Sequence, residues 1–211
     1  MMINPKGLLK FLPTIGILVF IGIYIYASQL YPGGSIADIN SIGFDWSNNH
    51  WCNLMRERSL NGIQNQARPV AIAGISILCF SMIIFFIQFA NYFEKSRNWN
   101  ITIKISGGLA MLSATFIFTE YHDIMTTILS ICGTIVLIGM IRALHINKLT
   151  FFKVMGVFCV LIIGLNNFFY YSEDLIQYSP LVQKGAFLLI LSWTIGLNFI
   201  INRKNVPQQL D

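Results

Sequence analysis

Residues 69–90 read PVAIAGISILCFSMIIFFIQFA, an apolar stretch without a single Asp, Glu, Lys or Arg. A helix needs roughly 20 predominantly apolar residues to cross the hydrocarbon core of a bilayer, and this stretch meets that requirement. Pro69 is a favourable first residue, because its missing N–H would have no partner within the helix. The stretch therefore predicts a membrane-spanning helix.

The composition of the whole chain points to the same class of protein. Of its 211 residues, 55% are hydrophobic and 11% are charged, whereas a soluble domain usually carries about 25% charged residues. The length predicts a single integral membrane domain over residues 1–211. The net charge of +5 comes without a basic run, so we expect no nucleic-acid partner.

Five further apolar stretches resemble residues 69–90 in length and character. The six predicted spans are residues 11–30, 69–90, 101–119, 124–144, 151–171 and 183–201. Most connections between them are short, which favours antiparallel packing of sequential helices. We therefore predict an all-α, polytopic membrane protein built as a six-transmembrane-helix bundle.

The distribution of Lys and Arg predicts the orientation. Six spans place both termini on one side, together with ten of the fourteen Lys and Arg residues, and leave four on the other side. Loops rich in Lys and Arg remain in the cytoplasm. We therefore predict a multi-pass protein of the cytoplasmic (inner) membrane with both termini cytoplasmic.

The outer loop, residues 31–68, is too long for a bare connector. Asp45 or Ser47 can cap a helix start, and Trp51 and Leu54 share one face of the helix that would follow. The pattern predicts a short amphipathic helix on the outer membrane surface. Trp46 and Trp51 suit the interface with the lipid headgroups.

The same loop also carries more polar side chains than an anchor requires, so it is alternatively a lid over an outward-facing polar pocket. The turn after residue 119 and the end of the span 151–171 bring further polar residues to that side. The candidate pocket residues are Asp45, Asn49, His50, Asn53, Arg68, Glu120, His122, Asp123, Asn166, Asn167, Tyr170, Glu173 and Asp174.

Part of this set is compatible with chemistry. Two histidines and a carboxylate would make a hydrolytic zinc site. His50 and His122 could form one with Glu120, Asp123 or Asp45. The sequence contains no HExxH, HxxxH or GxSxG motif. We therefore predict no metal site and no cofactor, and keep a metal-dependent lipid hydrolase or transferase as an alternative.

The outer loop also carries a local pattern: Tyr-Pro-Gly-Gly, then Asp-Trp-x-x-Asn, then Asn-Gly and Asn-x-Ala-Arg-Pro within residues 31–69. With the six-span layout, this resembles the bacterial DUF998-type membrane proteins and, more distantly, the Frag1/DRAM/Sfk1 family. The resemblance implies a six-helix membrane protein of undefined activity, whose relatives are linked to lipid handling. It carries over no catalytic residues.

Together these observations predict a protein that binds a membrane lipid, or a protein partner within the membrane, through an extracytoplasmic polar pocket. An accessory subunit of a larger membrane complex is a further alternative, favoured by the small size and the lack of a soluble domain.

Overall fold

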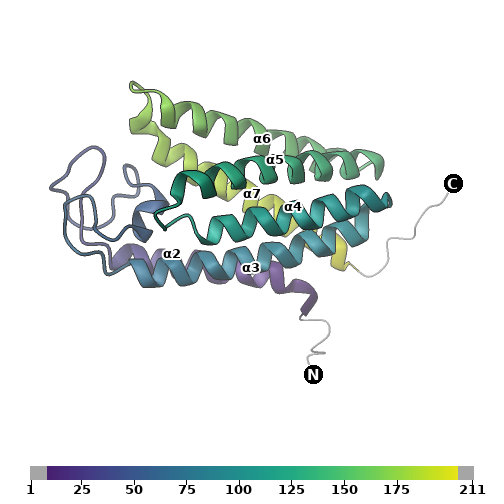
Figure 1. Ribbon diagram of the computed structural model, residues 1–211, viewed down its shortest axis with the longest axis horizontal. Coiled ribbons are helices and arrows are strands. Elements are labelled where there is room, and N and C mark those ends of the chain that lie inside the picture. The colour runs from purple at the N-terminus through teal and green to yellow at the C-terminus, as the bar shows by residue number, and fades with distance from the viewer. Residues whose placement is uncertain (1–8, 204–211) are drawn as a thin grey trace.

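The chain is mostly helical over the part that the computed structural model describes, residues 9–203 without the side chains of Leu9, His122 and Asp123. The elements in chain order are η1 (Leu9–Phe11), α2 (Leu12–Gln29), η2 (Trp51–Met55), α3 (Arg68–Phe93), α4 (Arg97–Thr115), α5 (His122–Ile146), α6 (Thr150–Tyr171), η3 (Ile176–Tyr178) and α7 (Ser179–Asn202), where η denotes a short 3₁₀ helix. Figure 1 shows the long helices side by side along one axis, with the segment between α2 and α3 covering one end.

Helix α3 lies at the centre of the packing. It contacts α2, α4 and α7, while α5 packs on α4 and α6 packs on α7. Five helices of the described chain are long and apolar enough to cross a membrane: α2, α3, α5 from Ile124, α6, and α7 with the η3 turn before it. The chain is thus an all-helical protein with several segments of membrane-spanning length and composition.

Helix α4 differs from the span predicted at residues 101–119. It begins at Arg97 and ends at Thr115, so that Phe116–Thr119 form a turn. Compared with the predicted span, α4 therefore lacks apolar residues at its C-terminal end and has additional polar residues at its N-terminal end. It is not among the five helices that are long and apolar enough to cross a membrane. Its side chains still pack closely between α3 and α5.

Small residues allow α2, α3 and α4 to approach closely. A Cβ atom on Gly16 would lie 1.7 Å from Ser81 Oγ, and one on Gly107 would lie 2.5 Å from a ring carbon of Phe86. Helices in a membrane associate largely through such close van der Waals packing. The distance from α3 to α2, and that from α3 to α4, therefore depend on glycine at these contacts.

Buried polar side chains join the helices at the end opposite the outer loop. The Asn198 amide accepts a hydrogen bond from Thr14 Oγ1 at 2.8 Å and donates one to Gln88 Oε1 at 2.9 Å. Arg142 pairs with Glu94 at 2.6 Å. These bonds connect α2, α3 and α7 on one side and α3 and α5 on the other.

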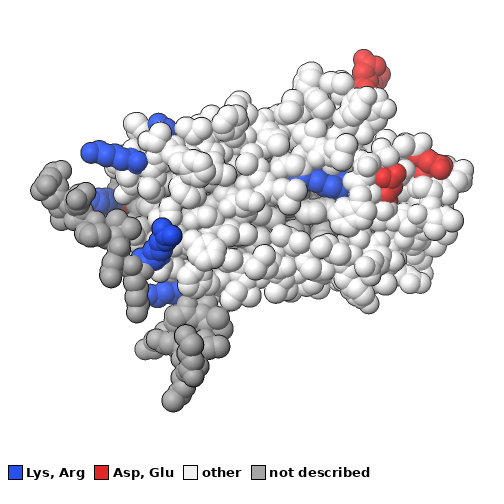
Figure 2. Space-filling view, turned by 180° about the vertical axis from the view of Figure 1, so that it is seen from behind, with Lys and Arg blue, Asp and Glu red and all other residues white. Residues whose placement is uncertain are grey.

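The charges are unevenly distributed along the bundle. On the face seen in Figure 2, Lys and Arg lie mostly at the end where η1 and the last turn of α7 lie. Asp and Glu lie at the end covered by the outer loop, where a basic side chain is also visible. This asymmetry agrees with the distribution predicted along the sequence.

Gly16→Ala tests the close packing of α2 on α3. The new methyl group would overlap Ser81, and overpacking of this kind costs about 1–3 kcal/mol. We expect a lower Tm for the detergent-solubilised variant in a thermal unfolding assay. Gly22→Ala is the control, because a Cβ there meets nothing within 4 Å. A similar Tm for the two variants would contradict this packing.

Candidate functional site

The outer loop between α2 and α3 is an ordered structure without long helices. Its first turn is closed by the bridge between Gly33 and Ile42, and the Gly34 N–H donates to the Ser41 carbonyl at 2.8 Å. Gly34 has a φ of +83°, and a Cβ there would lie 2.4 Å from the Asn61 nitrogen. A second bridge joins Arg58 and Gln64.

The prediction of an amphipathic surface helix in this loop is wrong. The segment is instead the five-residue 3₁₀ helix η2, which ends because Arg56 is extended, with a ψ of 151°. Trp51 is only 7% exposed and its ring lies 5.7 Å from that of Phe20 and 5.1 Å from that of Phe187. Trp51 therefore belongs to the core. Of the two tryptophans expected at the interface, only Trp46 is exposed, at 44%.

Asp45 was expected to cap a helix, but it caps a turn that precedes η2. Its carboxylate accepts hydrogen bonds from the N–H groups of Ser47 and Asn48. The Asn48 side-chain amide also donates to this carboxylate, at 2.9 Å. This side-chain bond, together with the two backbone bonds, holds the pKa of Asp45 below its usual value. The residue before η2, His50, makes no side-chain capping bond.

Two buried asparagines hold the loop together. Asn65 Nδ2 lies 3.2, 3.0 and 3.0 Å from the carbonyl oxygens of Asn53, Leu54 and Arg56. Asn49 Nδ2 donates to the Gly34 carbonyl at 2.8 Å. Such amides satisfy backbone groups that have no partner in a helix or a strand.

Side chains of α7 tie the loop to the bundle. Gln183 Oε1 accepts a hydrogen bond from the backbone N–H of Trp51 at 2.9 Å. The Lys184 ammonium group donates to the Asn49 carbonyl and lies 5.8 Å from the ring centroid of Phe44. The loop is thus fixed to the end of the bundle by hydrogen bonds as well as by the burial of Trp51.

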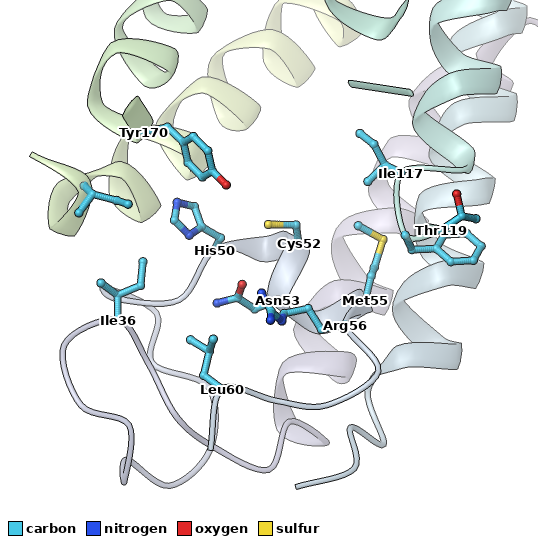
Figure 3. A pocket seen from close by; sticks show the side chains of 12 residues that line it. Ile36, His50, Cys52, Asn53, Met55, Arg56, Leu60, Ile117, Thr119 and Tyr170 are labelled. Carbon is cyan, nitrogen blue, oxygen red and sulfur yellow. The ribbon is translucent and has the colours of Figure 1, made fainter. Parts of the chain in front are cut away.

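A cavity of about 430 Å³ lies between η2, the turn after α4 and the last turn of α6. Its walls combine apolar side chains with a few polar ones, as is usual in ligand sites. The lining residues are Ile36, His50, Cys52, Asn53, Met55, Arg56, Leu60, Ile117, Phe118, Thr119, Tyr170 and Ile176. Figure 3 shows His50 and Tyr170 close together on one side of the cavity and Ile117 and Thr119 on the other.

The imidazole of His50 lines this cavity and is buried. Its Nε2 lies 2.8 Å from Ser179 Oγ, and its ring centroid lies 5.9 Å from that of Tyr170. Burial lowers the pKa of His50 to about 4, and the positive charge of Lys184 contributes to the shift. The imidazole is therefore neutral at pH 7.

Burial also raises the pKa of the Cys52 thiol, so the thiol that lines the cavity is protonated at neutral pH. A reactive cysteine requires a lowered pKa. Cys52 is therefore a small, weakly polar part of the wall.

The structure brings only part of the predicted pocket together. His50, Asn53 and Tyr170 line the cavity. Asp45 and Asn49 support the loop through the bonds described above.

The other predicted residues lie elsewhere or outside the described part. Arg68 is the half-buried first residue of α3, and Glu120 is exposed in the turn after α4; neither lines the cavity. Asn166 is half-buried in α6, whereas Asn167, Glu173 and Asp174 are exposed. The residues His122 and Asp123 begin α5, and their side chains lie outside the described residues.

Several residues of the cavity are not in the predicted set. Cys52 and Arg56 belong to the segment that was taken for a surface helix. Residues 117–119 belong to the predicted span 101–119, and a position within a membrane span does not indicate a role in the wall of the cavity. Ser179, which contacts His50 from outside the lining, is also absent from the predicted set, because the contact joins residues 129 positions apart.

A metal centre has little support in the described part of the chain. No group of three His, Cys, Asp or Glu side chains gathers there in a way that could hold a metal ion. Within that part, the arrangement offers hydrogen-bond donors and one cation to a ligand.

The neutral state of His50 predicts a pH dependence. Its pKa in the folded chain lies below the value of 6.5 of an unperturbed histidine, so the unfolded chain binds more protons as the pH falls from about 6.5 to about 4. The stability that the neutral ring contributes should be lost across this window. We expect the Tm of the wild type to fall from pH 7.5 to pH 5 by more than that of His50→Gln, whose amide does not titrate. An equal fall in both proteins would contradict this role of His50.

No family model matches the chain, and neither the curated proteins nor the solved structures contain a match to it. The resemblance to the DUF998-type proteins thus stays a prediction, and the function must be inferred from the cavity.

Proposed function

We propose that this chain is a six-span protein of the bacterial inner membrane, with both termini cytoplasmic, that binds a membrane lipid in its outer cavity. A relationship to the DUF998-type proteins is part of this proposal. The observation that carries it is the 430 Å³ cavity at the end of the bundle, walled by an ordered loop and by helix ends. An anchoring loop would need no such space.

The sixth span of this proposal is α4. Its 19 residues extend over about 28 Å at 1.5 Å per residue, close to the thickness of the hydrocarbon core. Arg97 lies at its first residue, and Lys104 is near enough to that end for its long side chain to extend toward the interface. The concentration of Lys and Arg at the same end supports a cytoplasmic location for it.

The level of the cavity suits a lipid. Tyr170 belongs to the last turn of α6 and Ile117 to the turn after α4, so in a membrane the cavity would lie near the headgroups. Apolar walls and a few polar groups in one space match a molecule with an apolar and a polar part. The outer loop acts in this proposal as a fixed wall of the site.

A second candidate is binding of a protein partner at the tip of the loop. Ile42 is 97% exposed, and Ile39, Ile63 and Trp46 are exposed as well. Exposed apolar residues of this kind are common at protein interfaces. The lipid proposal is preferred because the cavity offers space lined by both polar and apolar side chains, whereas the tip offers only exposed apolar side chains.

The alternative of a lipid hydrolase or transferase has less support. Of the five residues named for a zinc site, only His50 lines the cavity among the described side chains. Its Nε2 faces the hydroxyl of Ser179, which also lies 2.6 Å from the Ile176 carbonyl. Lipid binding without chemistry is therefore the proposed activity.

Ile36→Trp tests lipid binding. The Ile36 side chain lines the cavity and is 39% exposed, so a larger ring can enter the space without replacing a core residue. Ile42→Trp is the matched control, because Ile42 belongs to the same loop and does not line the cavity. Lipids that remain bound to the purified proteins are quantified per mole of protein by mass spectrometry.

We expect the wild type and Ile42→Trp to retain an enriched lipid and Ile36→Trp to lose most of it. A wild type without any lipid enriched over the bulk membrane would contradict the proposal, and so would equal retention in all three proteins.

Labelling of single cysteines from outside tests the topology. A membrane-impermeant maleimide should reach Ile42→Cys in intact cells and Lys148→Cys only after permeabilisation, because the proposed orientation puts these exposed positions on opposite sides. Labelling of both positions from the same side would contradict six spans. The wild type serves as the background for its own four cysteines.

A further inference from the structure

We propose that the outer cavity selects an anionic group, a phosphate ester, held by the guanidinium group of Arg56 and the side-chain amide of Asn53. This inference rests on the proposed lipid binding and specifies the headgroup. It is carried by the charges of the lining residues, by an unpaired cation and by a buried donor without a partner.

The charges of the lining favour an anion. Arg56 is the only residue of the lining with a permanent charge, and no Asp or Glu is among the twelve lining residues. The nearby cation Lys184 is occupied by the carbonyl oxygens of Asn49 and Pro180. A headgroup with a free ammonium group would find no carboxylate among these residues.

Arg56 is available to a ligand. Its side chain is exposed and makes no hydrogen bond or ion pair with any side chain or backbone group that the structure describes. Arg58, two residues away, instead donates to the Gly62 carbonyl at 2.9 Å. A guanidinium group presents five donors in a plane and binds phosphate oxygens in pairs.

Asn53 is the second donor. Its side chain is 5% exposed and lines the cavity, yet its Nδ2 has no hydrogen-bond partner. Nearly all buried polar groups of native proteins have a partner, so an unpaired one that lines a cavity indicates an acceptor on a ligand. Figure 3 shows the Asn53 amide beside Arg56 and below His50.

The remaining walls suit the apolar part of the ligand. Ile117 and Met55 lie on one side of Arg56 and Asn53 in Figure 3, and Phe118 completes that wall. A cavity of about 430 Å³ holds a headgroup and the start of an acyl chain, and the rest of the chain would stay in the bilayer. Inorganic phosphate would use the two donors and leave the apolar wall empty.

The experiment compares the full-length wild type with Arg56→Gln and Arg58→Gln. The two variants lose the same charge two residues apart, but only Arg56 lines the cavity. Binding of phosphatidylglycerol and of diacylglycerol, which has no phosphate, to the delipidated proteins is measured by native mass spectrometry. The Tm in millimolar inorganic phosphate and in the lipids is the second measurement.

We expect the wild type and Arg58→Gln to prefer phosphatidylglycerol. In Arg56→Gln this binding should weaken roughly tenfold to a hundredfold, the usual effect of losing charge-assisted hydrogen bonds, while diacylglycerol binding changes little. Asn53→Asp is a nearly isosteric second variant that places a negative charge beside the anion. It should abolish the preference while the protein remains folded.

The outcomes separate the two proposals. Binding of both lipids without preference, or equal losses in Arg56→Gln and Arg58→Gln, would overturn the anion site and leave lipid binding intact. No binding of either lipid would overturn the proposed function itself. Protection by inorganic phosphate that equals protection by phosphatidylglycerol would support the anion site and assign it to a free anion.

Discussion

The structure depends on the need to satisfy backbone polar groups without water. Inside hydrocarbon each N–H and C=O must be paired within the protein, and the long helices meet this demand residue by residue. Residues 30–67 leave the helices, so the backbone groups that are buried in this loop need other partners. Asn49 and Asn65 provide them from buried side chains, and Gln183 and Lys184 provide them from α7. The order of the outer loop is therefore a consequence of how its backbone is satisfied.

The cavity arises from the way this loop meets the bundle. Trp51 fills the space between α2 and α7, where its ring contacts Phe20 and Phe187, and this burial fixes the short helix η2. The side of η2 that faces away from Trp51 does not reach the turn after α4. The cavity lies between η2 and this turn. Arg56 and the Asn53 amide thus face a space instead of a protein partner, which is the basis of the proposed lipid site.

The spans predicted from the sequence agree well with the observed helices, because a long apolar segment in a membrane has few alternatives to a helix. Most predicted spans differ from the observed helices by a few residues at each end. The exception is α4, where apolar residues continued past the helix end and disguised the turn at residues 116–119. The surface helix in the loop was predicted from capping residues and spacing, and these local features do not reveal whether both faces of a short segment will be buried. Of the candidate site residues, His50, Asn53 and Tyr170 line the cavity, whereas Asn49 supports the loop.

The sequence by itself determined the all-helical architecture, the apolar segments and the uneven distribution of charge, because these follow from composition and from the length that a bilayer demands. The tertiary structure decided the rest. Whether Trp51 faces lipid or core, whether Arg56 has a partner, and whether His50 meets Ser179 depend on contacts between segments far apart in the chain. Such contacts are set by packing at the end of the bundle, and no local pattern of residues encodes them.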